Sequence, residues 1–323
     1  MGKYKKQIVI IVAVFGVFFI LNTLIGANII NRYITGLMIL SCINIILAVS
    51  LNLITGITGQ LSLGNAAFMA IGAYVSAFFS VNLGMPFIIS MIAGAVTAAA
   101  ISIIIGIPTL KLKGDYFAIT TLGVCEIVRV LITNMDIVGG ARGFTGIPKK
   151  TTFTIAYFAA VLVIVVVVNI VKSTKGRAML AIRENEIAAE AMGVNTTKYK
   201  VTAFFISAMI AGLAGALFSH YTAFIQPATF NFVKSIEIVT LVVLGGMGSI
   251  TGSVIAAIIL TILPEALRQF SDLRMILYSL ILIVLMIFRP QGLLGTLEIT
   301  DIIDKLKNKK NKKQKVEAPV SKS

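Results

Sequence analysis

Residues that carry catalysis or hold metals are scarce in this chain. Its 323 residues include no tryptophan, one histidine and two cysteines. His220 has no Cys or His cluster at metal-ligand spacing around it. Cys42 and Cys125 fall in apolar runs, which argues against a structural disulfide. The sequence also lacks a Gly-x-x-x-x-Gly-Lys-Ser/Thr phosphate loop. We therefore expect no metal site, no cofactor and no enzymatic activity in the chain itself.

Charge is also scarce, and this decides the class of protein. Charged residues make up 13% of the chain and hydrophobic residues 58%, with a mean hydropathy of +0.98. One soluble core could not hide that much apolar surface. We expect an all-α polytopic membrane protein, a helical bundle of about 8–10 transmembrane helices that includes broken or short helices and a cytoplasmic coupling helix.

The net charge of +15 does not indicate a nucleic-acid-binding protein. Residues 305–323 contain eight Lys and one Glu and so carry +7 of that charge. We interpret 305–323 as a disordered basic cytoplasmic tail that touches anionic lipid headgroups, and 1–304 as the membrane domain. No nucleic-acid partner is expected.

Apolar segments of transmembrane length recur along the chain. The candidate spans are 8–26, 34–54, 66–83, 87–107, 116–132, 153–171, 201–221, 236–263 and 275–288. The positive-inside rule places both termini, Lys111, Lys113 and the segment 172–200 in the cytoplasm. This topology places three basic residues on the outer side, contrary to the rule: Arg142, Lys149 and Lys150.

The segment 236–263 is too long for one upright span and contains a glycine-rich break. For the basic tail to be cytoplasmic, this segment must enter and leave on the same face of the membrane. We therefore predict two short helices around Gly245, Gly246 and Gly248. One long tilted helix with a glycine kink is the alternative.

The most polar stretch inside the apolar sequence is 175–193. Helical spacing puts Arg183, Glu186 and Glu190 on one face, and apolar residues including Ile182 on another. We predict one short amphipathic helix that ends at Gly193, which suits the left-handed position after a helix. The segment is either a solvated connector or a docking lever for a soluble partner.

Polar residues inside the predicted spans suggest a path for a solute. Glu126 and Arg129 are three residues apart, so one helix face can pair them, which serves either a pathway or the locking of two helices. A break near 55–65 supplies uncharged polar groups and is either a non-helical elbow lining a cavity or a simple loop. The candidate pathway residues are Gln60, Ser62, Asn65, Thr120, Glu126, Arg129, Gly245, Gly246 and Gly248.

Four motifs together resemble a known family. The stretch 176–193, Gly-Arg-Ala-Met-Leu-Ala-Ile-Arg-Glu-Asn-Glu-Ile-Ala-Ala-Glu-Ala-Met-Gly, resembles the cytoplasmic coupling loop of LivM-type permeases of branched-chain amino acid ABC importers. The stretches 56–68, 113–123 and 245–254 resemble the same LivH/LivM permease family in the same order. The stretch 138–148 resembles the family's outer loop, but it has Val138 where Thr is common and an unusual Arg142.

The resemblance implies a permease subunit in a bacterial inner membrane. It implies a second, LivH-like permease, two ABC ATPase subunits that bind the ATP, and an extracytoplasmic substrate-binding protein. The solute would be leucine, isoleucine or valine, while relatives carry other amino acids, urea or short amides. The ATPase-coupling residues implied are Gly176, Arg177, Ala181, Ile182, Arg183, Glu184, Asn185, Glu186 and Gly193.

Two other interpretations of the sequence remain. Glu126, Arg129 and the broken helices would also suit an ion-coupled secondary transporter of small polar solutes. A purely structural membrane scaffold would leave the two breaks and the coupling segment without a use.

Overall fold

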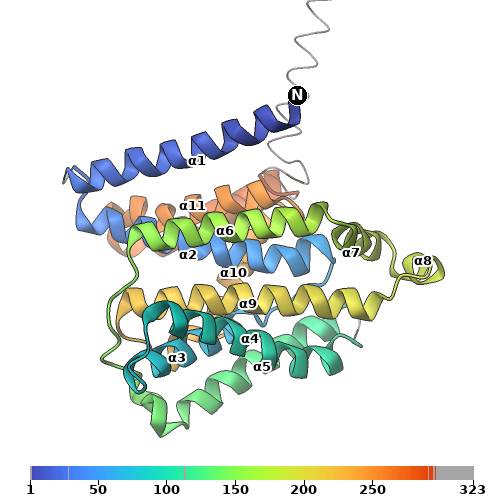
Figure 1. The fold of residues 1–323 in the computed structure, drawn as a ribbon, viewed down its shortest axis with the longest axis horizontal. Helices are drawn as coiled ribbons and strands as arrows, with labels where there is room; N and C mark the ends of the chain where they lie inside the picture. The colour runs from blue at the N-terminus through green and yellow to red at the C-terminus, as the bar shows by residue number, and fades with distance from the viewer. Residues whose placement is uncertain (1, 28, 113, 290, 294, 296–323) are drawn as a thin grey trace, which may run out of the picture.

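The computed structural model describes residues 2–27, 29–112, 114–289, 291–293 and 295 (Figure 1). Across these residues the fold is all-α, and the only β pairing is one isolated antiparallel bridge between Phe144 and Ile225. The predicted tail, 305–323, lies outside the described residues, as does Lys113. The all-α bundle expected from composition is confirmed.

The helices follow the apolar segments of the sequence. They are α1 (Gly2–Gly26), α2 (Arg32–Asn52), α3 (Asn65–Val81), α4 (Phe87–Thr109), α5 (Asp115–Thr133), α6 (Phe153–Lys172), α7 (Thr174–Glu184), α8 (Glu186–Ala191), α9 (Thr196–Thr222), α10 (Phe232–Gly245), α11 (Ile250–Ala266) and α12 (Arg274–Phe288). Six helices of the described part are long and apolar enough to cross a membrane. Shorter apolar helices cover Val14–Gly26, Asn65–Val81 and Ile276–Phe288. The protein is thus a multi-pass membrane protein with the short helices that the sequence predicts.

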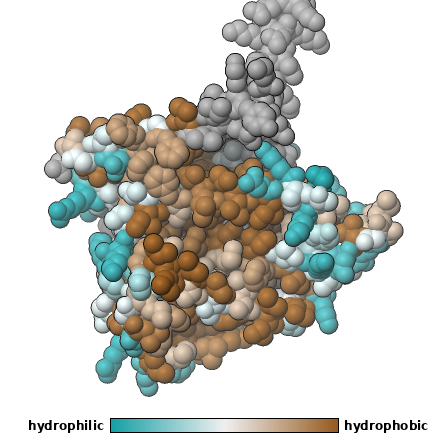
Figure 2. Space-filling view, viewed as in Figure 1, coloured by the Kyte–Doolittle hydropathy of each residue, from teal (hydrophilic) through white to brown (hydrophobic). Residues whose placement is uncertain are grey.

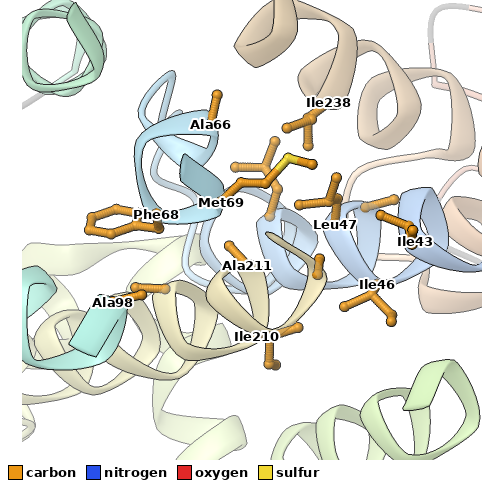
Figure 3. Close-up of a cluster of buried hydrophobic side chains, with 14 of the residues drawn as sticks. Ile43, Ile46, Leu47, Ala66, Phe68, Met69, Ala98, Ile210, Ala211 and Ile238 are labelled. Carbon is orange, nitrogen blue, oxygen red and sulfur yellow. The ribbon is translucent and has the colours of Figure 1, made fainter. Parts of the chain in front are cut away.

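The tightest packing joins α3, α4 and α9. A Cβ added at Gly72 would overlap the backbone of Gly212, and one added at Gly212 would lie 2.7 Å from the Cβ of Ala98. Ala208 and Ala216 are fully buried on the same helix as Gly212, so the predicted small-residue face of α9 is a packing face. Figure 3 shows Ala98 and Ala211 in the same buried cluster as larger apolar side chains such as Met69 and Leu47.

Helix α11 runs antiparallel to α2 along its length. Three contacts in order establish this: Asn52 Nδ2 donates to Ser249 O at 2.9 Å, Asn44 Nδ2 donates to Thr261 Oγ1 at 2.9 Å, and the Arg268 guanidinium lies over the Tyr33 ring. The break between α10 and α11 therefore lies at the C-terminal end of α2.

The segment 236–263 forms two helices rather than one. Helix α10 ends at Gly245 and α11 begins at Ile250, and the two pack with Gly245 against Gly252. Gly246 and Gly248 have φ values of 106° and 95°, which glycine adopts without strain. The two-helix prediction is confirmed, and the single kinked helix is wrong. Helix α10 runs toward the end of the bundle where α2 ends, and α11 runs back along α2 from there.

The surface separates into an apolar belt and two polar ends. Figure 2 shows hydrophobic residues over the middle of this face and hydrophilic residues gathered at the two sides, which are the ends of the helices. The α7–α8 segment projects from one end, where α2 and α6 finish and α9 begins (Figure 1). The loops after α1, α5 and α9 lie at the other end. This is the arrangement expected of helices that cross a bilayer.

The single histidine belongs to the packed interior. His220 is fully buried, its ring packs against Phe87, and its Nδ1 lies 3.0 Å from Ala216 O. Lys150 and Thr151 close over this end of α9 with hydrogen bonds to the His220 and Leu217 carbonyls.

Candidate coupling site and helix breaks

The polar segment 175–193 forms two helices, and the prediction of a single amphipathic helix is wrong. Helix α7 ends at Glu184, and Asn185 takes an extended conformation (φ −160°, ψ 109°). The Asn185 side chain then accepts from Ala188 N at 3.0 Å and caps α8. Asn is a preferred N-cap, and this local hydrogen bond favours a new helix start at Asn185 over one continuous helix. Gly193 has φ +81° and follows α8, as predicted.

The break turns the two acidic residues of α8 toward α9. Glu186 pairs with Lys200 at 2.5 Å, and the Lys200 side chain is only 7% exposed. Glu190 accepts from the Thr196 hydroxyl at 2.6 Å. The face predicted to hold Arg183, Glu186 and Glu190 together is therefore divided, and α8 is fixed to the start of α9.

Two apolar side chains are exposed at α8, one on the helix and one at its C-cap. Ile187 is 76% exposed and Met192 is 84% exposed. Arg177, Ala181 and Glu184 are exposed on α7. Exposed large apolar residues beyond the apolar belt, on a capped and anchored helix, have the character of a protein contact. The sequence analysis gave Ile187 no role.

The other side of α7 is packed onto the membrane domain. Gly176, Met179 and Ile182 are buried. A side chain at Gly176 would collide with the carbonyls of Ile170 and Val171 at the end of α6. The Ser173 side chain caps α7 by accepting from Gly176 N at 3.3 Å. Two of the predicted coupling residues, Gly176 and Ile182, thus fix α7 in place rather than face outward.

Arg183 extends from α7 into a cradle of three glycines. Its Nη1 donates to Gly56 O at 2.8 Å. A Cβ added at Gly248 would lie 2.5 Å from that Nη1, and one added at Gly59 would lie 3.1 Å from Arg183 Cγ. Gly56 belongs to the π-helical turn Leu53–Ile57 that ends α2, and Gly248 lies in the break after α10. The guanidinium therefore contacts both helix breaks.

Asn52 joins the same two breaks beneath Arg183. Its Oδ1 accepts from Gly248 N at 2.9 Å, and its Nδ2 donates to Ser249 O at 2.9 Å. Asn52 is buried, and a side chain at Gly56 would overlap its Oδ1. The sequence analysis did not place Asn52 at a site, because its partner Gly248 lies 196 positions away.

Of the elbow predicted near 55–65, residues 58–64 are irregular backbone, whereas 55–57 belong to the π-helical turn and residue 65 begins α3. Asn65 is buried and bonds to Ser50 and to Leu47 O, while Ser62 accepts from Gly64 N. Gln60 Oε1 is buried with no hydrogen-bond partner in the described structure. Thr121, which the sequence analysis missed, accepts from Leu63 N at 3.0 Å and ties the elbow to α5.

Glu126 and Arg129 pair as predicted, with Arg129 Nε donating to Glu126 Oε2 at 2.6 Å. Each side chain is 34% exposed. Glu126 Oε1 also accepts from Phe232 N at 3.2 Å, at the start of α10. Thr120 lies six residues before Glu126, and its hydroxyl donates to Tyr116 O of its own helix.

The predicted pathway residues thus form two groups rather than one. Glu126 and Arg129 lie at the start of α10, and the glycines lie at its end, roughly 20 Å away by the rise of a helix. A fully apolar cavity of about 650 Å³ between α3, α4 and α5 contains none of them; Tyr74, Phe78 and Leu131 are among its lining residues.

A family of known proteins matches most of the chain. Residues 33–289 match the family described as the branched-chain amino acid transport system, permease component. The chain belongs to this family. The match begins at the start of α2 and ends just after α12, so it includes both helix breaks and the α7–α8 segment.

Curated relatives carry the same description. The chain is 38% identical to the high-affinity branched-chain amino acid transport system permease protein LivM of Salmonella typhimurium, over 79% of this chain and 68% of that protein. It is 37% identical to LivM of Escherichia coli over the same shares. LivH of Escherichia coli is 25% identical over 79% of this chain and 92% of its own length. No solved structure matches.

Proposed function

We propose that this chain is the LivM-like permease half of an ABC importer for branched-chain amino acids. Its family and its multi-pass fold support a permease subunit, and the curated relatives are named for branched-chain amino acid transport. In this proposal the chain binds no cofactor, and ATP is bound and hydrolysed by separate subunits. The membrane is the bacterial inner membrane, with the α7–α8 end and both termini in the cytoplasm.

The observation that carries the proposal is the exposed apolar tip of α8. Ile187 and Met192 project from a short helix that is capped by Asn185 and fixed to α9 by Lys200. A rigid helix with apolar anchors suits insertion into a cleft of a soluble protein. We propose an ATPase subunit as the occupant, with Arg177, Glu184 and Asn185 at the rim of the contact.

The second half of the proposal is a partner permease and a shared path. Glu126 and Arg129 on α5 and the ion pair of Lys234 with Glu237 on α10 give these neighbouring helices a polar, partly exposed side. Partly exposed charges in membrane helices are expected to face protein or water rather than lipid. A LivH-like permease covering this side would complete a path, which an extracytoplasmic binding protein would supply with the amino acid.

Affinity purification from native membranes tests the proposal. We expect the chain to bring two ATPase polypeptides and a second permease, and the purified complex to take up leucine with ATP and the binding protein. The double variant Ile187→Asp and Met192→Asp should retain the second permease and lose the ATPases. Ile29→Asp is the control, because Ile29 is a similarly exposed apolar residue at the opposite end.

An ion-driven transporter predicts a different result. Proteoliposomes that contain this chain alone would accumulate solute under a proton or sodium gradient. Such uptake, or unchanged ATPase recovery by the double variant, would contradict the proposal.

A further inference from the structure

We propose that Arg183 is the residue through which movement of the α7–α8 segment reaches both helix breaks of the membrane domain. This inference rests on the proposed function, since it assumes that an ATPase moves α7. It assigns Arg183 a positioning role inside the permease, in place of the ATPase contact that the sequence resemblance implies.

The first support is the direction of the side chain. Arg183 is 28% exposed and points from α7 into the glycine cradle of Gly56, Gly59 and Gly248. Its guanidinium donates to a main-chain carbonyl, Gly56 O, at 2.8 Å. The nearest carboxylate in the described structure is that of the exposed Glu184, at 4.0 Å. The Arg183 guanidinium is therefore bound to the backbone of the membrane domain and not to a carboxylate.

The second support is electrostatic. The α2 helix and its π-helical turn end at Ile57, and α10 ends at Gly245. Helix C-termini carry partial negative charge from their free carbonyls. Arg183 places a permanent positive charge on Gly56 O, in the turn that ends α2, and beside Gly248, three residues after the end of α10, and it lies in the last turn of its own helix as well. Three helix ends are thus held around one guanidinium.

The third support is that the two breaks are already joined to each other. Asn52 bonds to both Gly248 N and Ser249 O, so the end of α2 and the start of α11 share one connection. Leu293 N donates to Leu244 O at 2.7 Å and adds the segment after α12. A displacement of Arg183 would therefore reach α2, α10 and α11 together.

The fit explains why glycines surround the guanidinium. Gly59 and Gly248 have positive φ values, and side chains at Gly56 or Gly248 would occupy the space of Asn52 or Arg183. Glycine is the residue that permits both the backbone conformation and the close approach. The path of connection runs from α7 through Arg183 to Gly56 and Gly248, and then through Asn52 into α11.

The experiment uses the complete importer, with Arg183→Gln in this chain and Arg268→Gln as the control. Arg268 lies at the opposite end, beyond α11, and its removal changes the net charge equally. We measure ATPase recovery, ATP hydrolysis and leucine uptake per ATP in proteoliposomes. We expect Arg183→Gln to keep the ATPases and to lower uptake per ATP by about tenfold or more, the factor for one charge-assisted hydrogen bond. The control should match the wild type.

Two results would overturn the inference. Uptake per ATP equal to the wild type would show that Arg183 carries no coupling. Loss of the ATPases from the Arg183→Gln complex would show that Arg183 is a docking contact instead. If no ATPase accompanies the wild-type chain, the proposed function itself fails. That result differs from both outcomes above, so failure of the proposed function and failure of the Arg183 inference can be told apart.

A distance measurement separates coupling from simple stability. Spin labels at Lys175→Cys and Met247→Cys report on α7 and on the α10–α11 break, and both positions are exposed, whereas the native Cys42 and Cys125 are buried. In the wild type the label separation should stay constant between the ADP and ATP-analogue states, because the segments move together. In Arg183→Lys, which keeps the charge but loses the planar fork, it should change with nucleotide. A wild-type separation that changes equally would overturn the inference.

Discussion

The carboxamide of Asn52 bonds the last two residues of the break between α10 and α11, accepting from Gly248 N and donating to Ser249 O, both at 2.9 Å. One buried side chain on α2 thereby fixes the backbone of a segment about 200 positions later. This contact holds the α10–α11 break against the end of α2, where Arg183 also reaches it. The two discontinuous parts of the bundle form one structural unit.

Replacing Asn52 with Leu should destabilise the protein and disturb this unit. Leu has the same branched shape but removes both hydrogen bonds, and a buried group that loses its partner costs about 1–3 kcal/mol. We expect a lower melting temperature in nanodiscs and lower uptake per ATP. Asn134→Leu is the matched control, because Asn134 is exposed and its side chain bonds only to Val130 O of its own helix. Equal stability of the two variants would contradict the prediction.

Gly72→Ala should be among the most damaging single-methyl changes in the chain. The added Cβ would meet the backbone of Gly212, which cannot move without separating α3 from α9. Overpacking of this kind typically costs about 1–3 kcal/mol. Gly16→Ala on α1 is the control, since nothing lies within 4 Å of a Cβ added there. We expect thermal unfolding to shift for Gly72→Ala alone, and a shift of the same size in both would refute the packing argument.

Much of this arrangement could be predicted from the sequence because it depends on local pattern. Apolar length predicted the spans, and charge parity predicted that 236–263 is two helices, which the break at Gly245 confirms. The pairing of Glu126 with Arg129 followed from helical spacing alone. Such features need only the residues of one segment.

The rest depended on contacts between distant segments. Helical spacing could not show that Arg183 bonds to Gly56, 127 positions away, or that Lys200 turns Glu186 inward. The division of the coupling segment was a local feature with a readable signal, because Asn185 is a good N-cap and an acidic residue follows it. The continuous apolar spacing around it concealed that signal.

Glu186→Ala should weaken ATPase binding although its side chain faces α9. The change leaves the mostly buried Lys200 ammonium without its carboxylate, which frees α8 from α9. We expect faster hydrogen exchange in 186–191 and lower recovery of the ATPases. The double variant Glu186→Leu and Lys200→Met should restore much of the protection, since apolar pairs replace buried ion pairs well. Unchanged exchange in Glu186→Ala would show that the ion pair does not fix α8.

Exchanging the charges of Glu126 and Arg129 separates the two roles of the Glu126 carboxylate. In the double variant Glu126→Arg and Arg129→Glu the ion pair is kept on the same helix face, but position 126 can no longer accept from Phe232 N. Loss of an acceptor at a helix start costs about 0.5–2 kcal/mol. We therefore expect the exchange to leave α10 less protected in hydrogen exchange and uptake reduced, whereas Arg129→Lys, which keeps the carboxylate at Phe232, should be close to the wild type. Full activity of the exchanged variant would mean that only the pair matters and that the contact between α5 and the start of α10 is incidental.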